Sequence, residues 1–553
     1  MGKFVKTLIA MLLCCCILLC GACKKADSGK DADKDKDDVD RGDYSKYTQL
    51  VIDGGGQNIS YNTTQSLKYD KYTNPYPYNT LEQLAEEWNK ANASVYGYYF
   101  TVAKTSINMD RETMVPMLQN GNAPEIIYYL GTTAAEDQNK GWFYDLKGEM
   151  EKPNKYSKQG ENGSVKWKDL YTSEEYGSFF TPNGQLFTVL LEKNPIGILY
   201  NKTILNAAGV TKTPETFKEF MEAQDKISAY SQTVGRGDKN DDSKYICPFF
   251  SYYPWYNSYL ESSLFAEDLE YFDVINVNGR IDSEEYVRAF MTKDPDGNRT
   301  YSPDNEKYEE LYRLIKLECK YYPARYQSYY AEQQFVSGNL AMIEVTGGSI
   351  RSFIDQVDGE FEIGVFPYPM LATQPEGEEQ SEYYTKYNKN DYIVRRGLSG
   401  YSTGWAITNS AMKKDAAKSD DKCVAACIDM LMYLSCFENN DKLINDRGFA
   451  IPLSGNTTYE HFVALAEQYE TDCRNDKTVA WACATAGDNM NKDFYDAVYL
   501  FRNTALDKKG DITKADLKTL LNSFTAAANT LYTQNKWDRT KWPAYGYSNK
   551  TGK

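Results

Sequence analysis

Residues 98–131, YYFTVAKTSINMDRETMVPMLQNGNAPEIIYYLG, contain the pattern of a strand, a helix and a second strand in succession. The first strand is expected over 98–107 and the helix from 111, with Gly121 as its end. The apolar run 125–131 has the length and character of a buried strand. This order predicts parallel strands with a helix packed on the sheet, because a parallel pair needs a crossover connection.

The same alternation of helical and extended patterns continues on both sides of this unit. Upstream, 80–93 is an amphipathic helix in which Thr80 and Gln83 have the spacing of a capping box. Downstream, extended stretches are expected at 184–202, 340–345 and 361–369, and helices at 214–230, 305–322 and 416–436. Alternation of this kind predicts an α/β protein with doubly wound sheets covered by helices. Residues 372–400 are polar and Tyr-rich and are expected to form an inserted surface loop.

Composition limits the class of protein. A chain of 553 residues is long enough for two or more domains. Hydrophobic residues make up 42% and charged residues 25%, which is the balance of a soluble globular protein. The formal charge of −16 argues against a nucleic-acid partner, since such proteins usually present a basic surface. The 47 tyrosines are too numerous to serve one site, so most are expected to be structural.

The N-terminal segment has the features of a bacterial lipoprotein signal. Lys3 and Lys6 precede an apolar stretch that is shorter than the roughly 20 residues of a membrane-spanning helix. The sequence LCGAC, ending at Cys23, resembles a lipobox, so 1–22 is expected to be a signal peptide and Cys23 the lipidated residue. The polar stretch to about residue 45 then serves as a flexible tether. The alternative is an ordinary secretory signal that is cut elsewhere.

Cysteine usage points to buried side chains rather than to disulfides. Seven cysteines follow Cys23, and an odd number in an exported chain does not make a disulfide framework. Cys423 and Cys427 share a helical face, but without a CxxC pair or a nearby His they are interpreted as small buried hydrophobic residues.

The sequence predicts no metal, no cofactor and no catalytic centre. Residues 238–249 have the ligand spacing of a calcium loop at their start, but Ser243 and Phe249 replace the Gly and Glu that such loops need. A solvated turn is favoured, and calcium stays the alternative. His461 is the one histidine, and no Gly-rich phosphate loop is present. The many carboxylates leave a glycoside hydrolase as a rival, although nothing in the sequence pairs two of them across a cleft.

Five segments resemble, in their order, the family 1 extracellular solute-binding proteins of ABC importers, especially the carbohydrate-type receptors. They are LQNGNAPEIIYYLG (118–131), ILYNKTILNAAGVTKTPETFKEF (198–220), FVSGNLAMIEVTGG (335–348), FEIGVFPYP (361–369) and GYSTGWAITNSAMKKDAAKSDDKCVAACIDMLMYL (400–434). Each motif alone is weak, whereas five in the family's order are specific. The resemblance runs from about residue 81 to 452, and Glu125 replaces the family's usual Asp.

The resemblance implies two doubly wound lobes joined by crossing hinge segments, as in type II periplasmic binding proteins. Lobe one is then expected to combine 45–193 with 368–449, and lobe two 198–364 with 453–553. The hinges fall near 194–197, 365–367 and 450–452. Ligand contacts from both lobes would stabilise a closed form that reports occupancy to a permease.

The resemblance also implies a set of ligand-contacting residues at strand ends and in ring-rich segments. They are Tyr129, Thr132, Asn194, Tyr253, Trp255, Gly348, Ser349, Tyr401 and Trp405. Trp255 lies in PFFSYYPWYNSYLES (248–262) and is expected to stack on a sugar ring, with core packing as the alternative. For Asn194 the alternative is a hinge role, and for Gly348 and Ser349 a plain helix start.

The predicted function is therefore a lipid-anchored, monomeric receptor outside the cytoplasm that binds a sugar or oligosaccharide and delivers it to ABC permease subunits. Two alternatives stay open within binding. One is a surface lipoprotein that holds polysaccharide without transport, and the other is a receptor for a peptide, a polyamine or another small solute.

Overall fold

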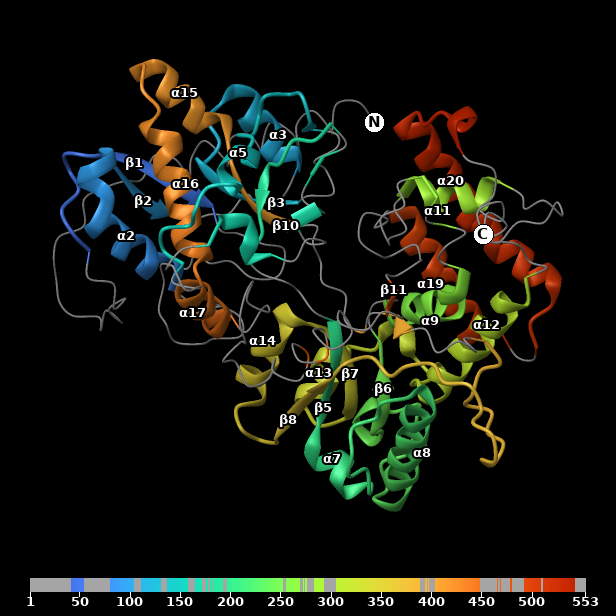
Figure 1. The fold of residues 1–553 in the computed structure, drawn as a ribbon. Helices are drawn as coiled ribbons and strands as arrows, with labels where there is room; N and C mark the ends of the chain where they lie inside the picture. The colour runs from blue at the N-terminus through green and yellow to red at the C-terminus, as the bar shows by residue number, and fades with distance from the viewer. Residues whose placement is uncertain are drawn as a thin grey trace, which may run out of the picture. The chain divides into compact units, whose positions relative to one another are not determined.

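The computed structural model describes the folded body of the chain in several stretches. They are 41–53, 80–103, 111–130, 137–157, 165–171, 196–251, 255–268, 283–292, 305–387, 403–447, 492–508 and 511–542, with shorter pieces within 176–191 and isolated residues in the remaining gaps. They form two main sheets, each covered by its own helices (Figure 1), and a separate two-stranded pairing.

The first sheet has five strands in the order β2-β1-β3-β10-β4. Its strands are β1 (Thr48–Asp53), β2 (Tyr98–Val102), β3 (Ile126–Leu130), β4 (Thr188–Val189) and β10 (Thr403–Ile407). β1 runs parallel to both β2 and β3, as the strand–helix–strand pattern predicts, and lies between them. β10 is antiparallel to β3 and β4, so the sheet is mixed rather than fully parallel.

Helices pack on both faces of this sheet. They are α2 (Thr80–Tyr96), α3 (Arg111–Asn120), the short α5 (Lys147–Met150), α15 (Asn409–Lys418), α16 (Lys422–Ser435) and α17 (Phe437–Arg447). Two neighbouring residues of β3 belong to different core clusters. Tyr128 joins the cluster that contains Trp88 of α2, whereas Tyr129 joins the cluster that contains Leu118 of α3. Side chains alternate along a strand, so these two clusters lie on opposite faces, and the sheet is doubly wound.

The second sheet has four strands in the order β6-β7-β5-β8. They are β5 (Ile196–Asn201), β6 (Cys247–Phe250), β7 (Leu340–Thr346) and β8 (Ile363–Phe366). β6 and β7 are parallel, while β5 is antiparallel to β7 and β8. A small pairing of β9 (Ile393–Val394) with β11 (Thr478–Val479) is separate from it.

One large core cluster joins this sheet to its helices. The helices are α7 (Lys202–Ala207), α8 (Phe217–Thr233), α9 (Trp255–Phe265), α11 (Ser283–Met291), α12 (Glu306–Glu318), α13 (Ala331–Val336), α14 (Gly347–Val357), α19 (Lys492–Asp507) and α20 (Lys514–Asn535). α8 begins with a complete capping box between Thr216 and Glu219. Every residue of α9 is buried, so this helix is a central part of the core.

The placement of residues 368–394 differs from the predicted division into lobes. The side chains of Tyr368, Leu371 and Val394 belong to the core cluster of the four-stranded sheet. Met370 also pairs with Thr216 at the start of α8. The expected assignment of this segment to lobe one is therefore corrected, because its apolar side chains are buried against the other sheet. The next strand of the five-stranded sheet in chain order is β10.

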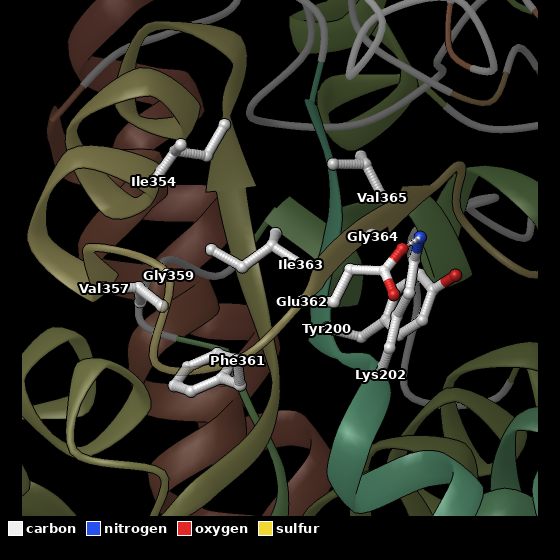
Figure 2. Close-up of a pocket in the computed structure, with 10 residues that line it drawn as sticks. All are labelled: Tyr200, Lys202, Ile354, Val357, Gly359, Phe361, Glu362, Ile363, Gly364 and Val365. Carbon is white, nitrogen blue, oxygen red and sulfur yellow. Dashed lines mark hydrogen bonds and ion pairs between the residues drawn. The ribbon is translucent and has the colours of Figure 1, made fainter.

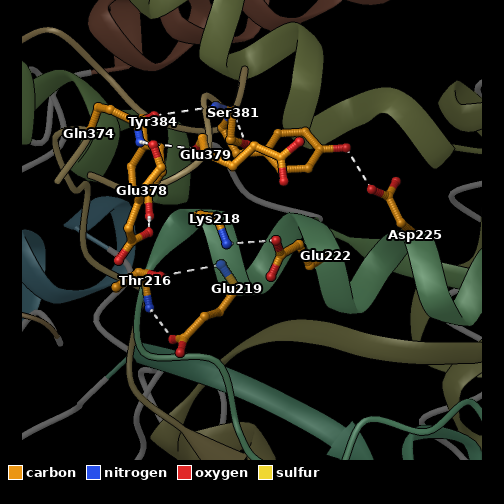
Figure 3. A network of polar contacts seen from close by, with 11 residues as sticks. Thr216, Lys218, Glu219, Glu222, Asp225, Gln374, Glu378, Glu379, Ser381 and Tyr384 are labelled. Atoms are coloured by element: carbon orange, nitrogen blue, oxygen red, sulfur yellow. Dashed lines mark hydrogen bonds and ion pairs between the residues drawn. The ribbon is translucent and has the colours of Figure 1, made fainter. Parts of the chain in front are cut away.

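The expected surface loop is attached to the helices of the four-stranded sheet as far as residue 387, where its continuously described part ends. Figure 3 shows its residues facing α8. Asp225 of α8 accepts hydrogen bonds from the hydroxyls of Tyr321 and Tyr383, both at 2.6 Å. On α12, Glu306 accepts a hydrogen bond from Lys386 at 2.8 Å. The segment is polar, as the sequence predicts, and these contacts fix it to the helices beneath it.

The described cysteines agree with the sequence interpretation. Five of the seven that follow Cys23 are described, and all five are buried: Cys247, Cys319, Cys423, Cys427 and Cys436.

Candidate functional site

One edge of the five-stranded sheet gathers the carboxyl ends of its parallel strands. β1, β2 and β3 end there at Asp53, Val102 and Leu130. β10 begins at the same edge, because Thr403 pairs with Leu130. Ligands of doubly wound proteins bind outside the carboxyl ends of the strands, so this edge is the first part of the candidate site.

A buried carboxylate, that of Asp137, holds two cationic side chains beside the same strands. Arg111, the first residue of α3, donates one hydrogen bond to each carboxylate oxygen at 2.9 Å. The Tyr129 hydroxyl donates at 2.8 Å, and Lys140 Nζ lies 3.1 Å from Oδ1. The side chains of Arg111 and Lys140 keep 30% and 38% of their surface exposed, so both are accessible to a ligand.

The protonation state of Asp137 is set by two opposing effects. Burial raises the pKa of its carboxyl, but hydrogen bonds from Arg111, Tyr129 and Lys140 outweigh burial and hold the pKa below the ordinary value. Asp137 is therefore ionised at neutral pH and keeps the guanidinium of Arg111 in a fixed orientation.

The four-stranded sheet presents a corresponding edge. β6 and β7 end there at Phe250 and Thr346. Ile196, the first residue of β5, pairs with Thr346, and Phe366, the last residue of β8, pairs with Ile198. The start of β5 and the end of β8 thus lie beside the carboxyl ends of β6 and β7, which makes this edge the second part of the candidate site.

A second buried carboxylate, Glu344 of β7, connects three segments at this edge. Its Oε2 accepts a hydrogen bond from Ser251 Oγ at 2.5 Å, and its Oε1 accepts one from the backbone N–H of Tyr256 at 2.8 Å. The hydroxyl of Tyr368 also donates to Oε1. Burial raises the pKa of Glu344 to about 7, and hydrogen bonds from Ser251 and Tyr368 limit the rise.

Three of the aromatic residues predicted to contact ligand lie inside hydrophobic cores. Tyr129 and Trp405 have no exposed surface, and Trp255 keeps 8%. Trp405 packs edge-on against Tyr128 with ring centroids 5.7 Å apart. The alternation of strand residues places Tyr129 and Trp405 against helices rather than beyond the strand ends. These placements favour a core role for Tyr129 and Trp405, whereas Trp255, the first residue of α9, lies at the candidate edge.

The predicted glycine and serine contacts lie where β7 passes into α14. Gly348 and Ser349 belong to the first turn of that helix. Ser349 Oγ is 3.3 Å from Thr346 Oγ1, and the Ser349 side chain is partly exposed. A helix start at a strand end offers backbone N–H groups to a polar ligand. The predicted contacts Thr132, Asn194, Tyr253 and Tyr401, together with Cys23 and His461, lie outside the described residues.

A cavity of about 370 Å³ lies at the other edge of the four-stranded sheet (Figure 2). Figure 2 shows Tyr200, Lys202 and Glu362 on one side of it and Ile354 and Val357 of α14 on another. Tyr200 lies near the end of β5 opposite Ile196, so this cavity is separate from the candidate edge.

The described residues show neither a membrane-spanning helix nor a cluster of metal ligands. No helix in this part of the chain combines the length and apolar character needed to cross a membrane. The described stretches also contain no group of three or more His, Cys, Asp or Glu side chains placed to bind a metal.

Sequence reasoning did not find Arg111, Asp137 or Glu344. Asp137 lies in a polar stretch that resembles any solvated loop, and only the fold brings it to Arg111. Glu344 did carry a signal, because it is a lone acid inside the apolar run LAMIEVT of β7. An ionisable residue at a buried strand position needs partners, and that requirement alone would have marked it.

Comparison with known proteins gives a consistent result. Residues 74–419 match the family model of the bacterial extracellular solute-binding protein. A multiple sugar-binding protein of Streptococcus mutans is 24% identical over 300 residues, which are 53% of this chain and 60% of that protein. The chain thus matches about three fifths of the length of this curated relative.

Two solved structures show the fold class. The apo-form of RafE from Streptococcus pneumoniae is 16% identical with a TM-score of 0.52, over 88% of this chain and 98% of that chain. The GacH receptor of Streptomyces glaucescens, solved without ligand and with acarbose, is 13% identical with a TM-score of 0.51, over 88% and 99%. The type II periplasmic-binding-protein-like fold predicted from the sequence is confirmed.

Proposed function

Because the chain belongs to the family of bacterial extracellular solute-binding proteins, we propose that it is the receptor of an ABC importer and captures a sugar or an oligosaccharide. In this proposal it works outside the cytoplasm, held at the membrane by a lipid on Cys23, and delivers its ligand to permease subunits. Its role is binding without catalysis, and it acts as a monomer.

The observation that carries the proposal is the match of residues 74–419 to the family model. In addition, each of the two main sheets has an edge of strand ends that carries hydrogen-bonded polar side chains. In such folds, contacts from two lobes to one ligand favour the closed form, because the ligand binds that form better. This coupling would let a permease distinguish the occupied receptor from the empty one.

Several side chains at the two edges have the chemistry that a saccharide needs. Arg111 and Lys140 supply partly exposed donors held by Asp137. Ser349 supplies a hydroxyl at the start of α14. Trp255, which keeps 8% of its surface exposed, is proposed to supply an apolar ring. Sugars are recognised by such rings together with a few oriented polar groups.

The predicted contact residues divide into two groups under this proposal. Trp255, Gly348 and Ser349 are proposed to contact ligand, together with four predicted residues outside the described ranges: Thr132, Asn194, Tyr253 and Tyr401. Tyr129 and Trp405 are proposed to support the edge from within the core, because neither has exposed surface.

The names of the compared proteins support a carbohydrate ligand. One is a multiple sugar-binding protein, and the GacH receptor was solved with acarbose. A further structure of RafE was solved with raffinose.

A thermal-shift screen tests the proposal. The purified chain is heated with raffinose, maltopentaose and a chitin oligosaccharide, and a saccharide that binds only the folded protein must raise the melting temperature. Small-angle scattering with the same saccharide should show compaction. A protein that binds polysaccharide without compaction would instead support the surface-binding alternative, and cleavage of the oligosaccharide would support a hydrolase.

A further inference from the structure

The loop 321–330 packs on the carboxyl end of β6. The rings of Tyr322 and Tyr329 lie against Phe250, the last residue of that strand, with ring centroids 4.5 and 4.9 Å away. The backbone N–H of Ser251, the residue after the strand, donates to the Tyr322 hydroxyl at 2.8 Å. Because β6 ends at the candidate edge of the four-stranded sheet, this loop borders that edge.

The backbone at Tyr330, the last residue of the loop, is fixed on both sides. The N–H of Ala331 donates to the carbonyl of Tyr329 at 3.0 Å, and Tyr330 between them has φ −83° and ψ 74°. This is the geometry of an inverse γ-turn, which is common where a loop meets a regular element. The Tyr329 ring is buried against Phe250 before the turn, and α13 begins directly after it. The direction in which the Tyr330 side chain leaves the backbone is therefore set by its neighbours.

The ring of Tyr330 is exposed, which sets it apart in this chain. It keeps 71% of its surface, whereas every other tyrosine whose burial the structure describes is buried or half-buried. Single exposed hydrophobic residues are common on protein surfaces, so exposure alone assigns no role. Here the ring also stands on a fixed backbone beside a ligand edge. A ligand that stacks on it would not have to order the loop first, which lowers the entropic cost of binding.

The same loop carries an oriented amide. Gln327 Nε2 donates to the Tyr326 hydroxyl at 3.3 Å, and that hydroxyl donates to Asp507 of α19 at 3.0 Å. Gln327 is exposed and lies in a short 3-10 turn, three residues before Tyr330. An apolar ring together with an oriented polar group is the combination that suits a sugar, which has an apolar face and a rim of hydroxyls.

We propose that Tyr330 is an outer stacking residue of the saccharide site, and that the ligand is an oligosaccharide with one unit packed on this ring. The inference rests on the proposed function and narrows its ligand class. Ser349 follows β7, whereas Tyr330 belongs to a loop packed on the neighbouring strand β6, so the two contacts are separate. A ligand held at the strand ends must extend past them to reach Tyr330, and a chain of sugar units has the length to do so.

Titration calorimetry on the full chain with ligands of two lengths tests the inference. The pairs are raffinose with stachyose, maltose with maltopentaose, and chitobiose with chitopentaose. For a pair that binds, wild type should bind the longer member more tightly. Tyr330→Ala should weaken binding of the longer member by about tenfold or more, because apolar surface of the sugar is no longer covered, and should change binding of the shorter member little. Tyr330→Phe keeps the ring and should keep most of the wild-type affinity.

Thermal unfolding without ligand separates a binding role from a structural one. Because the ring is exposed, Tyr330→Ala should keep the melting temperature of wild type. The matched control is Tyr47→Ala, which removes a half-buried ring directly before β1, at the opposite end of that strand from the candidate edge. This control should leave the affinity for both ligand lengths unchanged. A lowered melting temperature in Tyr330→Ala with unchanged affinity would make the ring structural and overturn the inference.

The remaining outcomes distinguish this inference from the proposed function. Wild-type affinity of Tyr330→Ala for the longer ligand would overturn the inference. An equal loss for both lengths, or a wild type that binds both lengths equally, would also overturn it. In each of these cases wild type still binds a saccharide, so the proposed function stands. If no saccharide binds wild type, the proposed function and this inference both fail.

Discussion

Glu261→Gln is predicted to stabilise the protein at alkaline pH and to change its stability little at acid pH. Glu261 lies in the middle of α9 and is only 2% exposed. Its carboxylate accepts a hydrogen bond from the Tyr308 hydroxyl at 3.3 Å. Burial raises the pKa of Glu261 from 4.5 to about 8, and hydrogen bonds from Tyr308 and Tyr286 offset only part of the rise.

The size of the effect follows from this pKa. A carboxyl group with a higher pKa in the folded protein binds its proton more tightly there, so stability falls as the pH rises from the unfolded to the folded pKa. With values of 4.5 and about 8, the loss between about pH 5 and about pH 9 is roughly 4 kcal/mol. Gln does not ionise, so the advantage of the variant over wild type should grow by roughly this amount across the same range.

Urea unfolding followed by fluorescence at several pH values measures this difference. The matched control is Gln224→Ala, which alters a buried neutral amide on α8 and should shift the unfolding free energy equally at every pH. If the difference in unfolding free energy between Glu261→Gln and wild type were the same at acid and alkaline pH, the Glu261 carboxyl would not have a raised pKa in the folded protein. The claim that burial in α9 disfavours the ionised form of Glu261 would then be wrong.

Three further predictions concern other parts of the chain. Trp255→Ala should lower the free energy of unfolding by about 3–5 kcal/mol without ligand, because the indole is largely buried in the core. If the variant instead kept the ligand-free stability of wild type and lost every ligand-induced rise in melting temperature, the ring would be a ligand contact alone. Cys23→Ala should release the protein from membranes on fractionation, and membrane retention with no acyl mass on the N-terminal peptide would exclude the lipid anchor. Calcium should not raise the melting temperature. Asp238 Oδ1 already accepts hydrogen bonds from the backbone and side chain of Asn240 at 3.0 and 3.1 Å. A calcium-dependent rise in melting temperature that Asp238→Ala abolishes would contradict this prediction.

Much of the fold could be predicted because each element carries its own local signal. The strand–helix–strand unit at 98–131 appears as β2, α3 and β3, and the expected helix at 80–93 appears as α2. The order of five family motifs then predicted the fold class that the solved structures confirm. These features depend on periodicity and on residues close together in the chain, which a single sequence contains.

The orientation of side chains was less predictable. Trp405 was expected to contact ligand, yet its position in β10 directs it into the core with Tyr128. The segment 368–394 looked like the start of lobe one, but its buried Tyr368 joins it to Glu344 of the other sheet. Both outcomes depend on strand register and on contacts between distant residues, which local patterns do not contain.

Calorimetric titration of the purified chain tests the central claim most directly. The titrants are raffinose, maltopentaose and a chitin oligosaccharide, with spermidine and a short neutral peptide as non-sugar comparisons. The account predicts saturable binding of one saccharide per chain and no binding of the polyamine or the peptide. Binding of the peptide or polyamine with no heat from any saccharide would contradict the proposal that this receptor captures a sugar.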